Sequence, residues 1–313
     1  MTMKQVVLVT GVFIWFTSCK LQPESIRSFD KDKVYKLQLK PSPGSVYKYE
    51  ISNETDMNME VERKEVGALN KYTVELKYTV STDSLGNYLF TTTYDKIKLY
   101  TKSGDKETEM NADNAAVTID PVEKLLGTLK TAKIVATLNP KGEIINVSGY
   151  KELGDQLMAG FAEDDHMGKE MAQHQWQKTI GSGVVKNTMD QLFKVFPDSA
   201  IHIGDTWKID SKQEGELPMI TKSIYTLKAI NDDIAIISSE GIITSGESNS
   251  IMGYNNATLN LEGKQTAEFE VETKTGMLIN GRIKAAINGK LELMGKEIPV
   301  EIKTSVKMNG SKH

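Results

Sequence analysis

Two histidines and a glutamate have the spacing that could place a metal ion on one face of a helix. His166, Glu170 and His174 recur at every fourth residue, so a continuous helix would align two imidazoles with one carboxylate. The zinc-protease pattern requires a glutamate directly after the first histidine, which this spacing does not provide. The neighbouring residues are mostly charged or polar, so the sequence favours an exposed surface here, and a metal-dependent hydrolase is the alternative.

Other patterns of catalytic residue types are incomplete. Asp164 and Asp165 could act as paired carboxylates, but the sequence supplies no sugar-binding platform beside them. The run Gly181-Ser182-Gly183 is half of a nucleophile elbow and lacks the preceding buried strand. Glycine-rich phosphate-binding motifs are also missing from the sequence. We therefore expect a protein that is not an enzyme and needs no cofactor.

The single cysteine, Cys19, lies where a lipid anchor would be attached. Lys4 precedes an apolar run, Gln5 to Phe16, which is shorter than the roughly 20 residues that a membrane-spanning helix needs. The tetrad Phe16-Thr17-Ser18-Cys19 resembles the lipobox of bacterial lipoproteins, in which the cysteine is acylated, for example with palmitate. We expect a signal peptide at 1–18 and a polar tether at 19–33. An ordinary secretory signal with a chance cysteine is the alternative.

Length and charge restrict the class of protein further. The chain has 313 residues and a formal net charge of −4, and one cysteine excludes an intrachain disulfide. An acidic chain without a basic run argues against a nucleic-acid partner. Lys20 after the cysteine resembles lipoproteins that are passed on to the outer membrane. The sequence leaves open whether the protein would face the periplasm or the exterior.

Hydrophobic periodicity divides the mature chain into three parts. Apolar residues alternate with polar ones over 34–149 and again over 198–310, which predicts half-buried antiparallel strands. Between them, 150–197 has helical spacing and ends its last helix at Pro197. We therefore predict an α+β fold, mainly β, with one or more curved antiparallel sheets built from two similar strand-rich halves and a central helical insertion.

A weak internal repeat relates the two strand-rich parts. Pro43-Gly44-Ser45-Val46-Tyr47-Lys48 matches Ile203-Gly204-Asp205-Thr206-Trp207-Lys208. Further on, Gly142-Glu143-Ile144-Ile145-Asn146 matches Gly276-Met277-Leu278-Ile279-Asn280. Two related sheets could pack together or join into one, whereas chance recurrence of turn residues is the alternative.

Methionines are frequent and could line an adaptable apolar site, although filling of the core is the favoured interpretation. Those after the signal region include Met57, Met59, Met110, Met158, Met167, Met171, Met189, Met219, Met252, Met277 and Met294. Trp176 and Trp207 could also face a ligand, but packing is the more usual role of a buried tryptophan.

The lipobox, the strand-rich body and several turn motifs together resemble an uncharacterised lipoprotein family of Bacteroidota. The motifs are Pro43 to Tyr49, Phe196-Pro197-Asp198, Ile203 to Trp207 and Thr273 to Met277. A curved sheet over helices is also loosely similar to periplasmic lipoprotein carriers. The resemblance implies no reaction. We therefore expect a membrane-anchored, non-catalytic protein of the cell envelope that binds an apolar ligand or an envelope partner, with a structural or assembly module as the alternative.

Overall fold

The computed structural model divides the chain into two compact units, Met1–Lys33 and Val34–His313, and the fold described below is that of the second unit. The residues that the structure describes are 32–61, 64–118, 120–159, 166–167, 169–170, 173, 186, 189–190, 192–213, 217–246, 250–251, 254–255, 257–293 and 295–313.

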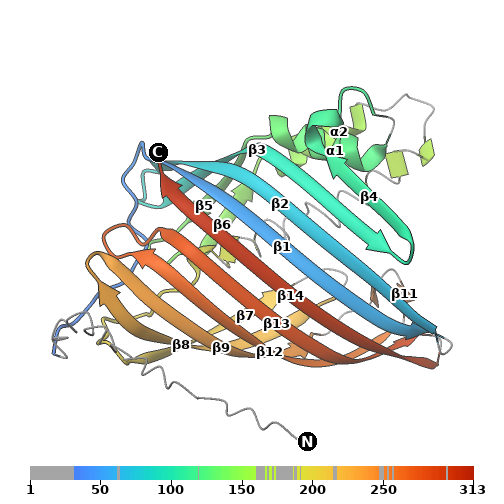
Figure 1. The fold of residues 1–313 in the computed structure, drawn as a ribbon. Helices are drawn as coiled ribbons and strands as arrows, with labels where there is room; N and C mark the ends of the chain where they lie inside the picture. Colours follow the sequence, from blue (N-terminus) through green and yellow to red (C-terminus); the bar gives the residue numbers. More distant parts are fainter. Residues whose placement is uncertain are drawn as a thin grey trace, which may run out of the picture. The chain divides into compact units, whose positions relative to one another are not determined.

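Long antiparallel strands form one continuous sheet of twelve (Figure 1). Its strands are β1 (Val46–Val61), β2 (Lys64–Thr82), β3 (Tyr88–Ser103), β4 (Lys106–Asn111), β5 (Ile134–Leu138), β6 (Ile144–Ser148), β7 (Thr206–Gln213), β8 (Met219–Asn231), β9 (Ile234–Ser245), β12 (Thr258–Glu272), β13 (Leu278–Leu293) and β14 (Lys296–Lys312). The order is β6-β5-β3-β2-β1-β14-β13-β12-β9-β8-β7, and β4 pairs with β3. A separate pair joins β10 (Ser250–Ile251) and β11 (Tyr254–Asn255).

The strand order repeats within the sheet. Strands β6-β5-β3-β2-β1 have the same arrangement as β13-β12-β9-β8-β7, and β14 lies between the two sets. Equivalent turns precede β1 and β7. Gly44 donates its N–H to the carbonyl of Val80 at 2.8 Å, and Gly204 donates to that of Leu227 at the same distance. Both glycines have positive φ, a conformation that the repeated turn requires and that other residues seldom adopt.

A tyrosine on β1 forms a hydrogen bond with β13 and so links the two strand sets across β14. Tyr49 on β1 lies opposite Gly310 on β14, and its hydroxyl donates to the carbonyl of Leu278 on β13 at 3.0 Å. A Cβ at Gly310 would lie 2.6 Å from the Tyr49 ring, so glycine makes room for the side chain to cross. The Tyr49 ring is buried, and this contact therefore joins residues from opposite ends of the chain.

Short helices lie beside β3 and β4 (Figure 1). They are the 3-10 helix η1 (Ala112–Asn114) and the α-helices α1 (Pro121–Thr131) and α2 (Tyr150–Ala159). Asp120 caps α1 by accepting the N–H groups of Val122 at 2.7 Å and Glu123 at 3.1 Å. Leu125, Leu126 and Leu129 of α1 are buried, so the helix covers part of the sheet.

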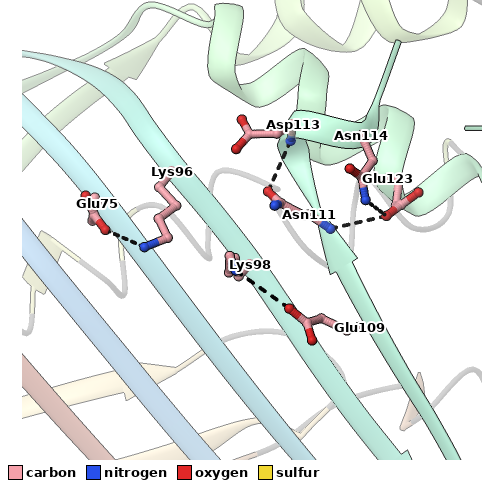
Figure 2. Close-up of polar contacts among 8 residues, drawn as sticks. All are labelled: Glu75, Lys96, Lys98, Glu109, Asn111, Asp113, Asn114 and Glu123. Atoms are coloured by element: carbon pink, nitrogen blue, oxygen red, sulfur yellow. Dashed lines mark hydrogen bonds and ion pairs between the residues drawn. The ribbon is translucent and has the colours of Figure 1, made fainter. Parts of the chain in front are cut away.

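The junction from β4 into α1 is held by one carboxylate (Figure 2). Glu123 Oε1 accepts the N–H of Asn111 at 3.2 Å and the side-chain amide of Asn114 at 3.1 Å. Hydrogen bonds from Thr118, and then from Asn114, lower the pKa of Glu123. The carboxylate therefore satisfies donors that the turn would otherwise leave unpaired.

The predicted α+β class is wrong, because the unit is a nearly all-antiparallel sheet rather than a balance of sheet and helix. Strand β14 pairs with β1 and β13, which makes both strand-rich parts one open sheet. Alternation revealed strands but not this pairing, which joins residues far apart in sequence.

Three smaller differences also appear. The alternating residues 35–39 form a bridge between Tyr35 and Ile201 rather than a sheet strand. The described helical residues end at Phe193 rather than at Pro197. Helix α1 was not predicted, although Asp120-Pro121 followed by Glu123 is a typical helix start.

Candidate ligand-binding face

Of the three residues in the predicted metal site, the structure describes His166 and Glu170. His166 and Glu170 are helical and exposed, whereas His174 lies outside the described residues. Asp164, Asp165, the Gly181–Gly183 run, Trp176 and Cys19 also lie outside them. Among the described residues, no group of three or more histidine, cysteine, aspartate or glutamate side chains could hold a metal ion.

Side-chain alternation gives the sheet two faces of different composition. Buried residues of every long strand point to one face, which we call the inner face, and their neighbours point to the outer face. In the regular register of the described strands, charged inner-face side chains occur only at strand ends. These are Lys64, Lys106, Lys296 and Lys312, all of them exposed. The bulge residues Asp95 and Lys228 are exposed as well.

The inner face carries two separate groups of buried apolar residues. The large apolar cluster includes helix α1 and an aromatic group in which Tyr78 contacts Tyr49, Phe90 and Phe193 edge to face. The small apolar cluster comprises Met219, Ile243, Ala257, Leu259, Leu261, Ile287, Leu291, Val300 and Ile302. Met57 and Met59 are half-buried and pack against the small cluster. Methionine thus has a packing role at these two positions.

A band of uncharged polar and small residues crosses the inner face between the clusters. It follows the strand register from β3 to β8 and consists of Thr101, Asn70, Thr55, Thr304, Ala285, Gln265, Gly241 and Ser223. We call these residues the polar row. On β13, Ala285 lies between Ile283 of the large cluster and Ile287 of the small one. The row therefore separates two buried apolar clusters on a single face.

Most of the polar row is partly accessible. Thr101, Asn70, Thr55, Thr304, Ala285 and Gln265 are half-buried, whereas Gly241 and Ser223 are buried. The hydroxyls of Thr55 and Thr304 lie 3.3 Å apart, and either could be the donor. The Thr55 hydroxyl also donates a hydrogen bond to the side-chain oxygen of Asn53 at 3.2 Å. These groups can donate or accept hydrogen bonds but do not titrate near neutral pH.

An unsatisfied donor lies in the neighbouring row of the same face. Trp207 on β7 stacks on Tyr225 with ring centroids 5.8 Å apart, and Tyr225 lies opposite Ser239 on β9. Among the buried side-chain atoms of the described residues, Trp207 Nε1 has no hydrogen-bond partner. Burial raises the pKa of Tyr225 to about 12, so its phenol is neutral at physiological pH. A ligand carbonyl would be a suitable acceptor for the unpaired indole N–H.

The outer face has the opposite character. Lys96 contacts Glu75 at 2.8 Å and Lys98 contacts Glu109 at 3.7 Å, both across neighbouring strands (Figure 2). Further pairs join Lys71 to Glu54 at 3.1 Å and Lys77 to Asp95 at 2.7 Å. Charged side chains at strand centres destabilise a lipid-facing sheet, so this composition identifies the outer face as a surface for water.

The polar row was not found from the sequence. Its members belong to strands separated by up to 249 residues, and alone each is an ordinary polar residue of a β-strand. One local signal was available, since Asn53 and Thr55 occupy inward positions between Ile51 and Met57. A polar interruption of an apolar alternation indicates a site worth examining.

The fold and this face define an antiparallel β protein whose main sheet has an inner face without charge between the strand ends and a charged outer face. The chain belongs to the family of unknown function DUF6263, whose model matches residues 85–278, more than half of the sequence. A search of curated proteins finds no match. Among the helices that the structure describes, none has the length and hydropathy needed to cross a membrane.

Comparison with solved structures gives low similarity. The translocator domain of the autotransporter NalP from Neisseria meningitidis has 4% identity and a TM-score of 0.31, with 87% of this chain and 90% of that chain covered. An outer membrane channel from Pseudomonas putida F1 has 7% identity and a TM-score of 0.24, with 87% and 97% covered. OccK7 from Pseudomonas aeruginosa has 6% identity and a TM-score of 0.20, with 86% and 100% covered. Values this low support no conclusion about fold or function.

Proposed function

We propose that the protein is a lipid-anchored, non-catalytic protein of the cell envelope that binds an apolar ligand on the inner face of its sheet. The observation that carries the proposal is the inner face itself. It is uncharged between the strand ends and has two apolar clusters on either side of a half-buried polar row. Ligand sites in proteins are mostly apolar with a few placed polar groups, and this face has that composition.

The proposed location rests on the sequence around Cys19. Acyl chains on this cysteine would anchor the protein, since each buried methylene contributes about 0.8 kcal/mol to membrane binding. Lys20 and the resemblance to Bacteroidota lipoproteins favour the outer membrane. We expect Cys19→Ser to move the protein from the membrane fraction to the soluble fraction. Retention of this variant in membranes would contradict the anchor.

Ligand binding can be tested with two neighbouring alanines. Ala285 is half-buried within the polar row, whereas Ala286 is exposed on the outer face of the same strand. Ala285→Trp should place a large ring on the polar row and lower the amount of lipid that copurifies with the protein. Ala286→Trp adds the same side chain to the outer face and should leave copurified lipid unchanged.

The measurement is native mass spectrometry of the purified protein, followed by organic extraction and lipid analysis. Circular dichroism in the far ultraviolet verifies that both variants keep the wild-type secondary structure. A wild-type protein without extractable lipid, and without affinity for added lipid, would overturn the ligand-binding proposal. In that case, crosslinking to an envelope protein in cells would support the alternative of an assembly module.

A further inference from the structure

We propose that the ligand is an uncharged lipid with two acyl chains joined through ester or amide groups, of which diacylglycerol is the simplest example. This inference rests on the proposed function and specifies the ligand class of the same face. It follows from three properties of the inner face: its lack of charge between the strand ends, the polar row with the unpaired Trp207 N–H in the next row, and the pair of apolar clusters.

The lack of charge argues against a fatty acid or a phosphate group bound at the centre of the face. Burial of an ionised carboxylate or phosphate is costly unless a cationic side chain pairs with it. In the register of the described strands, the lysines of the inner face lie only at strand ends and are exposed. Lys303 and Lys284, which flank the polar row in sequence, point to the outer face. A neutral ligand avoids this cost.

The polar groups match ester and amide oxygens. The Gln265 side chain provides an amide donor at a half-buried position of the polar row, in the same row as the hydrogen-bonded hydroxyls of Thr55 and Thr304. One row away, the buried Trp207 Nε1 atom has no hydrogen-bond partner. An unpaired buried donor is uncommon in proteins and gains most from an acceptor that arrives with a ligand. A plain hydrocarbon would leave the Trp207 N–H unpaired.

The apolar clusters have the extent that acyl chains need. On β14, the small cluster together with Ile298, which packs against it, extends from Ile298 to Ile302, about 14 Å at the usual rise of a strand. One leaflet contributes about 15 Å of a bilayer core, which is the length over which an acyl chain packs. Val306 begins the large cluster on the other side of Thr304. One chain on each side would leave the linking esters beside the polar row.

The test compares three ligands that differ in charge and in hydrogen-bond acceptors. Dioleoylglycerol has acyl chains and neutral esters, oleate has a charged carboxylate, and hexadecane has no acceptor. Each is delivered from cyclodextrin to the purified, delipidated Cys19→Ser protein, and binding is measured by native mass spectrometry and by Trp fluorescence. We expect dioleoylglycerol to bind at least tenfold more tightly than oleate or hexadecane at neutral pH.

A double variant tests the role of the polar row. Thr304→Val with Gln265→Leu removes donors from the inner face, while Ser305→Ala with Thr266→Val changes the outward neighbours. A hydrogen bond contributes about a factor of 2 to 12 in affinity. The inner double variant, which loses two such groups, should therefore bind dioleoylglycerol about tenfold or more weakly than the wild type. Its affinity for hexadecane, and all affinities of the control, should stay unchanged.

The outcomes separate the inference from the proposed function. Equal or tighter binding of oleate or hexadecane by the wild-type protein would overturn the inference and leave a general apolar site. An inner double variant with wild-type affinity for dioleoylglycerol would also overturn it. If none of the three ligands binds, the proposed function itself fails. Because the comparison of ligands uses the wild-type face, it stands even if the double variant does not fold.

Discussion

Alanine at Gly142 should destabilise the fold far more than alanine at Gly86, although the two glycines have nearly the same positive φ. Their φ angles are +82° and +83°, and both lie in turns between neighbouring strands. A Cβ at Gly86 would meet no atom within 4 Å. At Gly142 it would lie 2.8 Å from the carbonyl carbon of Phe193 and closer still to its oxygen. A comparison of the two alanine variants therefore separates the cost of backbone strain from the cost of a steric clash.

The magnitude follows from what surrounds Phe193. The left-handed conformation costs a non-glycine residue about 1–2 kcal/mol, which both variants share. Overpacking that shifts a backbone costs about 1–3 kcal/mol more. The Phe193 side chain is fully buried against Tyr78 and Phe90, and losing its burial would cost about 3–5 kcal/mol. We expect Gly142→Ala to be at least about 2 kcal/mol less stable than Gly86→Ala.

Urea unfolding followed by circular dichroism measures this difference directly. Both variants should unfold with the wild-type dependence on urea concentration, so that the midpoint shifts report stability alone. If the two variants lose equal stability, the segment carrying Phe193 does not pack against the β5–β6 turn. The described contact between these distant parts of the chain would then be wrong.

Two further predictions concern local structure. Asp120→Ala should lower the free energy of unfolding by about 1 kcal/mol because α1 loses its cap, whereas Asp120→Asn should keep most of the wild-type stability. Thermal melts compare the two variants, and equal losses of stability would contradict the capping role. Hydrogen bonds from Asn87 lower the pKa of Asp83, so its contribution to stability is present above the ordinary carboxyl pKa and disappears as pH falls through the lowered value. The stability difference between wild type and Asp83→Asn should therefore shrink on acidification below about pH 4, and a difference that does not vary with pH would refute this assignment.

Local sequence patterns predicted much of the secondary structure but only fragments of the candidate site. Alternation in Tyr47, Tyr49 and Ile51 identified an inward-facing stretch of strand, because adjacent side chains of a strand point to opposite faces. The helix start at Asp120 was readable in the same way from capping chemistry, although it was overlooked. Two residues of the predicted metal site, His166 and Glu170, are exposed in the structure. Helical spacing alone could not show whether those side chains face a partner or water.

The sequence by itself determined which residues of each strand are apolar, where several turns occur, and that Cys19 follows a short apolar segment. Only the tertiary structure decided that β14 lies between β1 and β13, and hence that both strand-rich parts form one sheet. The same pairing aligns Thr55 with Thr304 and Ala285 with Gln265 in the polar row. The physical reason is that strand register depends on hydrogen bonds and side-chain packing between distant segments, and no local window of sequence contains both partners.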